Sequence, residues 1–203
     1  MDSSDLHLAH QFPSADSKIV ASLERISQAF RVLLWQESIT FSLSPIQVQI
    51  LVFLRYHNSD KCRVSYLADE FDMTKATISD AVKTLEIKKL IQKLPDTRDT
   101  RSFTIQLTPK GRDIAARTSY FTKEIYKPIS CMSREDKNNM LQNLLDIIRH
   151  LNKVGVITVQ RMCTTCVYYQ RGSENSRDFC RLLNQELSVA DLRIDCPEHQ
   201  PNE

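Results

Sequence analysis

The sequence predicts a mainly α-helical protein with one small β-hairpin, followed by a small domain built around four cysteines. Three observations support this fold class. Apolar residues recur at helical spacing through most of residues 17–153. Only 3 glycines occur among the 203 residues, which argues against a β-sandwich or barrel. Four of the 6 cysteines fall in the last part of the chain, after residue 162.

These observations divide the chain into three parts. Residues 1–16 are polar and without a period, and they are predicted to form a flexible extension. Residues 17–153 carry the helical pattern, and residues 154–203 carry the cysteine cluster. A chain of this length holds one ordinary domain and a small second one.

The first two helices are predicted from periodicity and from a capping signal. Between residues 17 and 40, apolar residues are spaced by four, three, four and three positions, at Ile19, Leu23, Ile26, Phe30 and Leu33. The next helix begins at the dipeptide Ser44-Pro45, where a serine N-cap precedes a proline at the first helical position.

Two further helices are predicted to be joined by a tight turn. A short helix covers residues 65–71, the turn follows at residues 72–73, and Thr74 caps a second helix that extends to about residue 88. On this second helix Ile78 and its neighbours face the core, while the opposite face is small and polar. Such a pair of helices is a helix-turn-helix, whose second helix can enter a DNA groove.

A β-hairpin, the wing, is predicted after the helix-turn-helix. Residues 90–94 and 102–107 read as its strands, and a polar, charged tip joins them. Thr108-Pro109 then starts another helix, which Pro128 is expected to interrupt. Ser133, with an aspartate three residues later, predicts a capped helix over residues 134–153.

The charge distribution and the chemistry of two elements indicate DNA binding. Residues 61–127 hold 14 basic and 9 acidic residues, whereas the parts on either side are slightly acidic. Side chains at the start of the second helix can bind phosphate, those farther along can reach base edges, and wing arginines suit phosphates or a narrow minor groove. The candidate DNA-binding residues are Thr74, Lys75, Thr77, Ser79, Asp80, Lys83, Arg98 and Arg101. Charged residues usually only solvate a helix face, but here the turn, the wing and the helix order all agree.

Residues 43–120 resemble the MarR family of winged-helix regulators. The resemblance rests on the helix-turn-helix at residues 64–79, on the turn that runs from residues 84–86 to residues 90–91, and on the wing at residues 96–101. The wing leads into the segment Leu-Thr-Pro-Lys-Gly at residues 107–111, another feature of the family. It implies a homodimer held by the first and last helices, with recognition helices in successive major grooves of a double-stranded operator. It also implies that Asp99 and Arg101 brace the hairpin.

One position departs from the family pattern. The family usually has glycine where the recognition helix ends in a left-handed conformation, and here that position is Lys89. Because a lysine with positive φ is uncommon, the helix end is expected to have a different shape.

The four late cysteines predict a metal centre. Cys163, Cys166, Cys180 and Cys196 have the spacing C-x2-C-x13-C-x15-C, and both Zn²⁺ and a 4Fe–4S cluster accept four thiolates. A single C-x2-C pair, the proline after Cys196 and the apolar residues between the ligands favour the cluster. Nearby arginines, Arg161 among them, are expected to offset the cluster's negative charge. The spacing of the four cysteines also resembles that in high-potential iron–sulfur proteins and in the small cluster-bearing subunits of some glycyl-radical enzymes.

The sequence thus predicts a DNA-binding transcription regulator whose operator affinity is controlled by a C-terminal 4Fe–4S cluster. The alternative is a regulator with a structural zinc site that senses a small molecule in the cleft between the dimer helices and the winged domain. An enzyme is not expected, because no catalytic or nucleotide-binding motif is present.

The location of the chain bears on its cysteines. The N-terminus lacks a basic segment followed by an apolar one, and no run of 18 apolar residues occurs, so we expect a cytoplasmic protein that does not meet a membrane. Thiols stay reduced there, which favours ligands over disulfides. Cys62 and Cys131 are isolated in sequence and are expected to be small buried hydrophobic residues.

Overall fold

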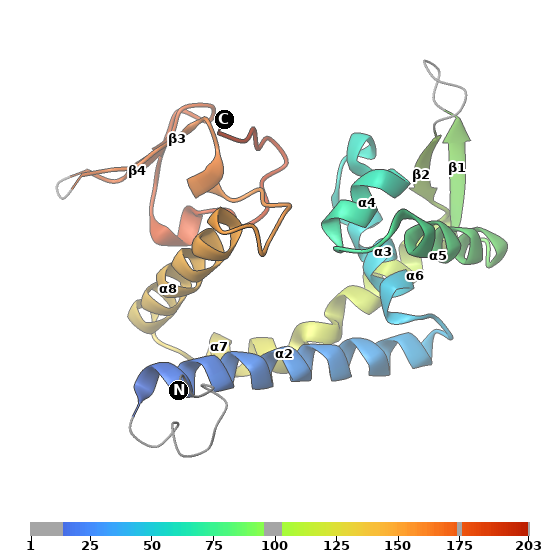
Figure 1. Cartoon of the computed structure of the whole chain (residues 1–203), viewed down its shortest axis with the longest axis horizontal. Helices are drawn as coiled ribbons and strands as arrows, with labels where there is room; N and C mark the ends of the chain where they lie inside the picture. Colours follow the sequence, from blue (N-terminus) through green and yellow to red (C-terminus); the bar gives the residue numbers. More distant parts are fainter. Residues whose placement is uncertain (1–13, 96–102, 174–175, 203) are drawn as a thin grey trace.

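The computed structural model describes residues 14–95, 103–173 and 176–202. Helix α2 (Ala15–Thr40) forms a long base, and two bodies stand on it. The winged body (residues 45–118) lies over the C-terminal end of α2 (Figure 1). Helix α8 and the cysteine-rich tail (residues 154–202) lie over its N-terminal end. The prediction of a mainly helical chain with a small hairpin is confirmed.

The first two helices begin at the predicted signals. Ser14 caps α2, and Ser44 caps α3 (Pro45–Tyr56), where Pro45 occupies the first helical turn. The Ser44 hydroxyl accepts the backbone N–H of Gln47, and the Gln47 side chain accepts the N–H of Ser44, which completes a capping box. Among the described helices none can cross a membrane alone, although α2 and α3, bent by 89° at their junction, reach the required length and apolarity together.

The helix-turn-helix consists of α4 (Val64–Glu70) and α5 (Lys75–Ile87), preceded by a short 3-10 turn, η1 (Ser59–Lys61). Leu67 of α4 packs with Ile78 and Leu85 of α5, and all three side chains are fully buried. Asp72 takes a positive φ of 49° in the turn. Side chains of α3, α4 and α5 share one close-packed buried core, so a displacement of α4 would disturb the packing of α5.

The end of α5 corrects one expectation. Lys89 adopts the left-handed conformation with φ 59°, as the family's glycine would, so the helix end keeps its usual shape. The N–H of Leu90 donates to the carbonyl of Leu85 at 3.0 Å, which satisfies a C-terminal carbonyl of the helix. The lysine side chain is exposed there, and the hydrogen bonds from the N–H groups of Lys89 and Leu90 to the carbonyls of Glu86 and Leu85 hold the backbone in this conformation.

The wing is an antiparallel pair of strands, β1 (Ile91–Pro95) and β2 (Phe103–Leu107), in which Ile91 faces Leu107. Helix α6 (Pro109–Thr118) follows with its predicted Thr108 cap. Gly111 on α6 has no room for a side chain, because a Cβ there would lie 1.9 Å from the carbonyl oxygen of Leu90. The close approach of α6 to the start of the wing therefore requires glycine.

The long helix expected after Thr108 is broken earlier than predicted. Helix α6 ends at Thr118, a 3-10 turn η2 (Ser119–Thr122) follows, and α7 (Lys123–Ser130) then continues through Pro128 instead of ending at it. Helix α8 (Arg134–Lys153) has the predicted bounds, and its Ser133 hydroxyl accepts the N–H of Asp136 at 3.1 Å.

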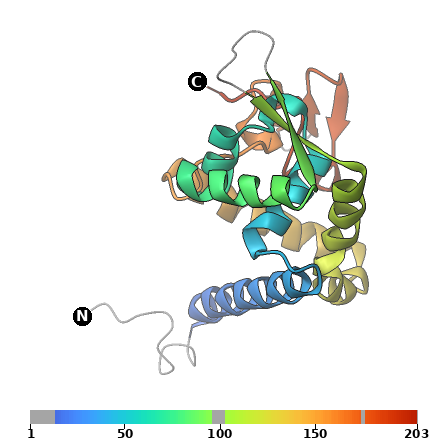
Figure 2. The ribbon, with the colours of Figure 1, turned by 90° about the vertical axis from the view of Figure 1, so that its right-hand side faces the viewer.

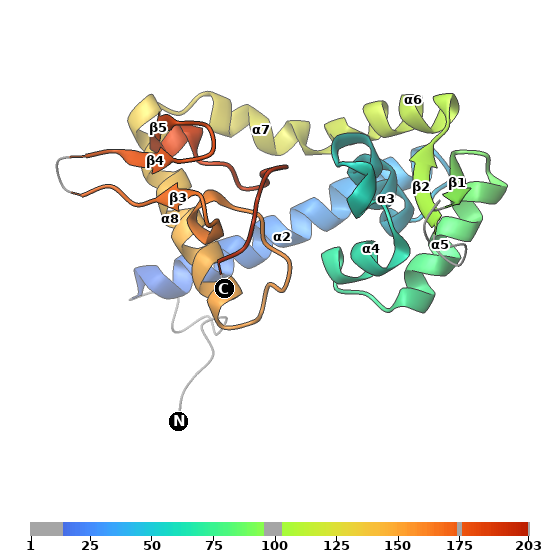
Figure 3. The same ribbon diagram turned by 90° about the horizontal axis from the view of Figure 1, so that it is seen from above.

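The tail is a small three-stranded sheet with two 3-10 turns. Strands β3 (Tyr169–Gln170), β4 (Asp178–Cys180) and β5 (Gln185–Leu187) pair antiparallel in that order, while η3 (Cys163–Thr165) and η4 (Val189–Asp191) flank them. The sheet packs over α8 (Figure 3). The buried core here is small, and it joins α8 to the tail through Leu145, Met162, Leu187 and Leu192.

Candidate DNA interface and four-cysteine site

Helix α5 presents a polar face to solvent. Figure 2 looks onto the winged body and shows α5 lying across its outer face, with the tail behind it. The six candidate DNA-binding residues on this element are all exposed: Thr74, Lys75, Thr77, Ser79, Asp80 and Lys83. The structure therefore brings these six together on one accessible surface, as a groove-reading helix requires.

The start of α5 is built to hold its hydroxyls in place. The Thr74 oxygen accepts the backbone N–H of Thr77 at 3.1 Å, and the two threonine hydroxyls lie 2.9 Å apart. Within the described residues neither Lys75 nor Lys83 forms an ion pair. Both ammonium groups thus remain available to phosphates, and Lys75 lies in the first turn of the helix, where the dipole also favours anions.

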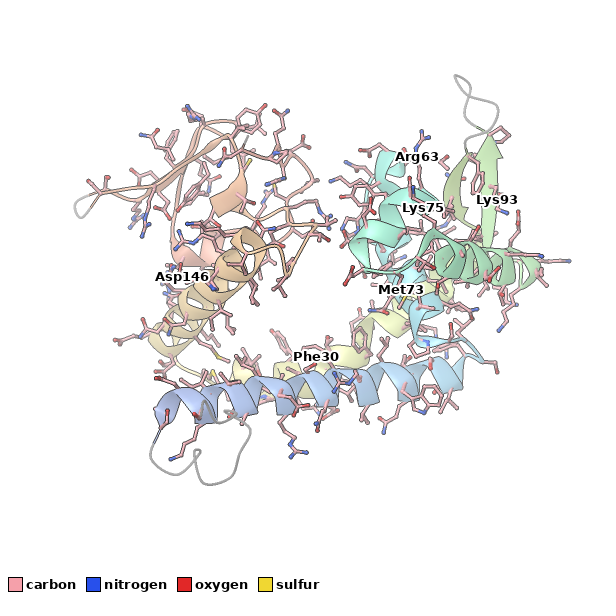
Figure 4. The ribbon with its side chains drawn as sticks, in the orientation of Figure 1. Phe30, Arg63, Met73, Lys75, Lys93 and Asp146 are labelled. Carbon is pink, nitrogen blue, oxygen red and sulfur yellow. The ribbon has the colours of Figure 1, made fainter. Side chains whose placement is uncertain are left out.

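The base of the wing is tied to the end of α5. Lys93 on β1 forms an ion pair with Glu86 of α5 at 2.7 Å and lies 5.0 Å from the ring centre of Phe103 on β2. Figure 4 shows Lys75 and Lys93 as labelled side chains on the winged body. The predicted contacts Arg98 and Arg101, with the expected brace at Asp99, lie outside the described residues.

The four predicted metal ligands line one hollow in the tail. Cys163, Cys166, Cys180 and Cys196 surround a space of about 30 Å³ open to the centre of a water molecule. One water needs roughly 10–15 Å³, so side chains do not fill this space. Its walls are mostly apolar or aromatic, from Tyr168, Tyr169, Leu182, Leu183 and Leu187.

Backbone and side-chain donors of Arg193 point at two of these sulfur atoms. The N–H of Arg193 donates to Cys163 Sγ at 3.2 Å, and its guanidinium donates to Cys196 Sγ at 3.7 Å. Burial raises the pKa of the Cys163 thiol, and the other three cysteines raise it further, although the N–H of Arg193 acts in the opposite direction. N–H donors to sulfur stabilise thiolates and tune the centres that they hold.

Four thiolates bind either a single zinc ion or a 4Fe–4S cluster, and the two groups differ in size. Zinc at 2.3 Å from each of four sulfur atoms would hold those atoms within about 4 Å of one another. In the part of the chain that the structure describes, no three His, Cys, Asp or Glu side chains come close enough to share one metal ion. A cluster is a larger body whose sulfur ligands stand farther apart than those of zinc, and the four free thiols line a hollow with mostly apolar walls.

Two expectations about single residues are wrong. Cys62 is buried as predicted, but Cys131 is exposed at the end of α7, where the helix break turns it to solvent. Arg161 does not face the thiols. It lies between the tail and the winged body, where it forms ion pairs with Glu70 and Asp195.

Residues around Arg161 form a contact that the sequence did not reveal. Asp195 comes from the tail, whereas His57, Tyr66 and Glu70 come from the end of α3 and from α4. Burial alone would lower the pKa of Arg161, but its hydrogen bonds with Glu70 and Asp195 outweigh burial and raise it. The partners lie up to 104 positions apart in sequence, so no local pattern indicates them.

An open cleft also lies where the zinc-site alternative expects a small molecule. It separates α2 from α6 and α7, has a volume of about 640 Å³, and is lined by Leu33, Phe41 and Tyr120 among others. Arg117 lies 4.8 Å from the ring centre of Phe41 at its edge.

Comparison with known proteins finds similarity in the winged part of the chain. Residues 41–102 match a model described as MarR family. The HTH-type transcriptional regulator SarZ of Staphylococcus haemolyticus (strain JCSC1435) is 22% identical over 98 residues, which are 48% of this chain and 66% of that protein. The chain thus spans just under two thirds of this curated relative.

Solved structures of DNA-binding regulators are also similar to this chain. The MepR–DNA complex of S. aureus is 28% identical, with a TM-score of 0.56, and the match covers 65% of this chain and 97% of that one. S. aureus MepR in its DNA-binding conformation is 26% identical, with a TM-score of 0.57, covering 66% and 98% of the two chains. The winged part of the chain, residues 41–102, is thus similar in sequence and in fold to winged-helix transcription regulators of the MarR family.

Proposed function

We propose that this chain is a homodimeric transcription regulator that binds double-stranded DNA and whose operator affinity is controlled by a 4Fe–4S cluster in the tail. The observation that carries the proposal is the convergence of all four late cysteines on one apolar hollow behind a winged-helix domain. A DNA-binding domain and a labile metal centre in one chain would allow the state of the metal centre to control DNA binding.

The DNA-binding part of the proposal rests on α5 and on the relatives. Its six exposed candidate residues lie on a helix that the tail does not cover, and two of them are lysines without an ion pair among the described residues. Two solved relatives are described as a DNA complex and as a DNA-binding conformation. We infer that α5 enters a major groove and that its first turn contacts phosphates.

The homodimer is supported by the apolar surface of the base helix. Ile19, Ile26 and Phe30 are exposed on α2, and their spacings of seven and four positions place them on one face of the helix. A contiguous exposed apolar face of this kind marks a contact with another chain. A dimer formed through α2 sets the distance between two α5 helices, which must match half-sites about 34 Å apart.

Cys163, Cys166, Cys180 and Cys196 would hold the cluster, and Arg193 would donate hydrogen bonds to two of their sulfur atoms. When bound, such a cluster supplies a group that responds to oxygen, oxidants, nitric oxide or iron supply. The tail has only a small core of its own, so we expect its fold to depend on the occupied site. Because Leu145 of α8 belongs to that core, loss of the tail's fold would also release α8.

Metal analysis of the protein purified without oxygen tests the choice of cofactor. We expect a brown protein with about four iron and four acid-labile sulfide per chain and little zinc, because the single C-x2-C pair and the apolar walls of the hollow favour a cluster. A colourless protein with one zinc per chain would refute cluster control and leave a zinc-stabilised regulator.

A further inference from the structure

We propose that Arg161 and Asp195 transmit the state of the four-cysteine site to the helix-turn-helix, with Glu70 as the receiving residue on α4. This inference rests on the proposed function and names the contact through which the regulation would act. Arg161 and Asp195 are parts of the tail, whereas Glu70 is the last residue of α4.

The guanidinium of Arg161 uses every donor that it has. Its Nε–H and one Nη2–H donate to the Asp195 carboxylate, and its other N–H groups donate to both oxygens of Glu70, at 2.7 and 3.1 Å, and to the Tyr66 hydroxyl, at 2.7 Å. Arginine has five such donors in a rigid fork, so this geometry fixes the tail against α4 in one orientation.

Burial makes this contact more than a surface ion pair. The Arg161 side chain is only 10% exposed, and that of Glu70 is 18% exposed. The guanidinium carbon also lies 5.9 Å from the ring centre of Phe53 and 5.8 Å from that of Tyr66. Removing one member of such a pair leaves a charge without its partner in a largely dry place, which costs far more than breaking an exposed pair.

Both tail residues are attached to predicted cluster ligands. Asp195 directly precedes Cys196, and Arg161 is two residues before Cys163. The N–H of Cys196 donates to the carbonyl of Arg161 at 3.0 Å, so the two segments are also bonded to each other. Cys163 and Cys196 can therefore hardly move without displacing the carboxylate and the guanidinium that hold α4.

The winged body receives the contact at two helices. Glu70 and Tyr66 lie on α4, and His57, at the end of α3, bonds Asp195 at 2.6 Å. The ring of His57 stacks on Phe53 of α3, with centres 3.7 Å apart. Since α4 packs against α5 through Leu67, a shift of α4 changes the placement of the candidate DNA-binding face.

The test compares the full chain with the variants Glu70→Gln and Asp69→Asn. Each removes one negative charge from α4, but Asp69 is exposed and outside the contact, so it is the matched control. Each protein is prepared with iron and sulfide and, separately, without metal. Hydrogen exchange of the amides in residues 64–70 and affinity for one operator fragment are measured for both forms.

In the wild type and Asp69→Asn, removing the metal should speed exchange in α4 severalfold and change operator affinity about tenfold. In Glu70→Gln the metal should have little effect on either quantity, while its iron content stays at the wild-type level. Two results would overturn the inference. One is hydrogen exchange in α4 of the wild type that is the same with and without metal. The other is a change in exchange and in operator affinity in Glu70→Gln as large as in the wild type.

The same data separate the two proposals. Metal-dependent exchange in α4 without any change in operator affinity would leave the coupling in place and contradict the proposed function. A metal-dependent affinity that persists in Glu70→Gln would support the proposed function and contradict the coupling. A chain that takes up neither iron nor zinc would contradict both.

Discussion

Serine at Cys180 is expected to abolish iron binding and to unfold the tail while leaving the winged body folded. Cys180 lies on the central strand β4 and lines the hollow, so the serine substitution removes one of the four sulfur ligands while leaving the strand backbone intact. Metal binding by structural sites contributes on the order of 10 kcal/mol to folding in small domains. The few buried side chains of the tail cannot replace that contribution.

Iron content and hydrogen exchange measure this outcome. Iron should fall to background, and amides of residues 163–200 should lose their protection, whereas those of α3 and α5 should keep it. Cys131→Ser is the control, because that thiol is exposed and distant in sequence from the tail. A Cys180→Ser protein with full iron and a protected tail would show that the thiols do not hold the tail together.

Alanine at both Lys75 and Lys83 is expected to weaken operator binding roughly ten- to hundredfold at moderate salt. Each ammonium group is exposed and, among the described residues, unpaired, so each can neutralise a phosphate and release a counterion. In a homodimer the two substitutions remove four such groups. The slope of log affinity against log salt should therefore become shallower by about 3 to 4.

Titrations of one operator fragment at several salt concentrations measure both quantities. The control is the double variant Arg171→Ala/Arg177→Ala, which changes the net charge equally but lies on the exposed surface of the tail, outside α2, α8 and the winged body. If both double variants weaken binding equally, the effect is one of net charge and α5 has no special role. Unchanged binding by the α5 variant would contradict the assignment of its outer face to DNA.

The winged body was predictable because its signals are local. Ser44, Thr74, Thr108 and Ser133 each cap the helix that the sequence assigned to them. Capping and apolar periodicity depend on residues three or four positions apart, so one sequence is enough to detect them. The shape of the α5 end was wrongly expected to change, because a single exposed lysine can adopt the left-handed conformation when the surrounding hydrogen bonds fix it.

The helix break and the contact at Arg161 were not predictable in the same way. The apolar spacing runs on through the 3-10 turn after Thr118, so the pattern conceals the break. The arginine was expected at the thiols because sequence proximity to Cys163 suggested it. Its partner Glu70 is 91 positions away and only the fold brings the two together, since long-range pairing leaves no local pattern.

The central claim is that an inorganic centre in the tail changes how tightly the paired α5 helices hold DNA. The direct measurement is the affinity of one operator fragment for the anaerobic iron-loaded protein and for the same protein after chelation, at several salt concentrations. We predict affinities that differ about tenfold at each salt concentration, with both forms dimeric. Equal affinities for the two forms throughout the series would contradict the claim.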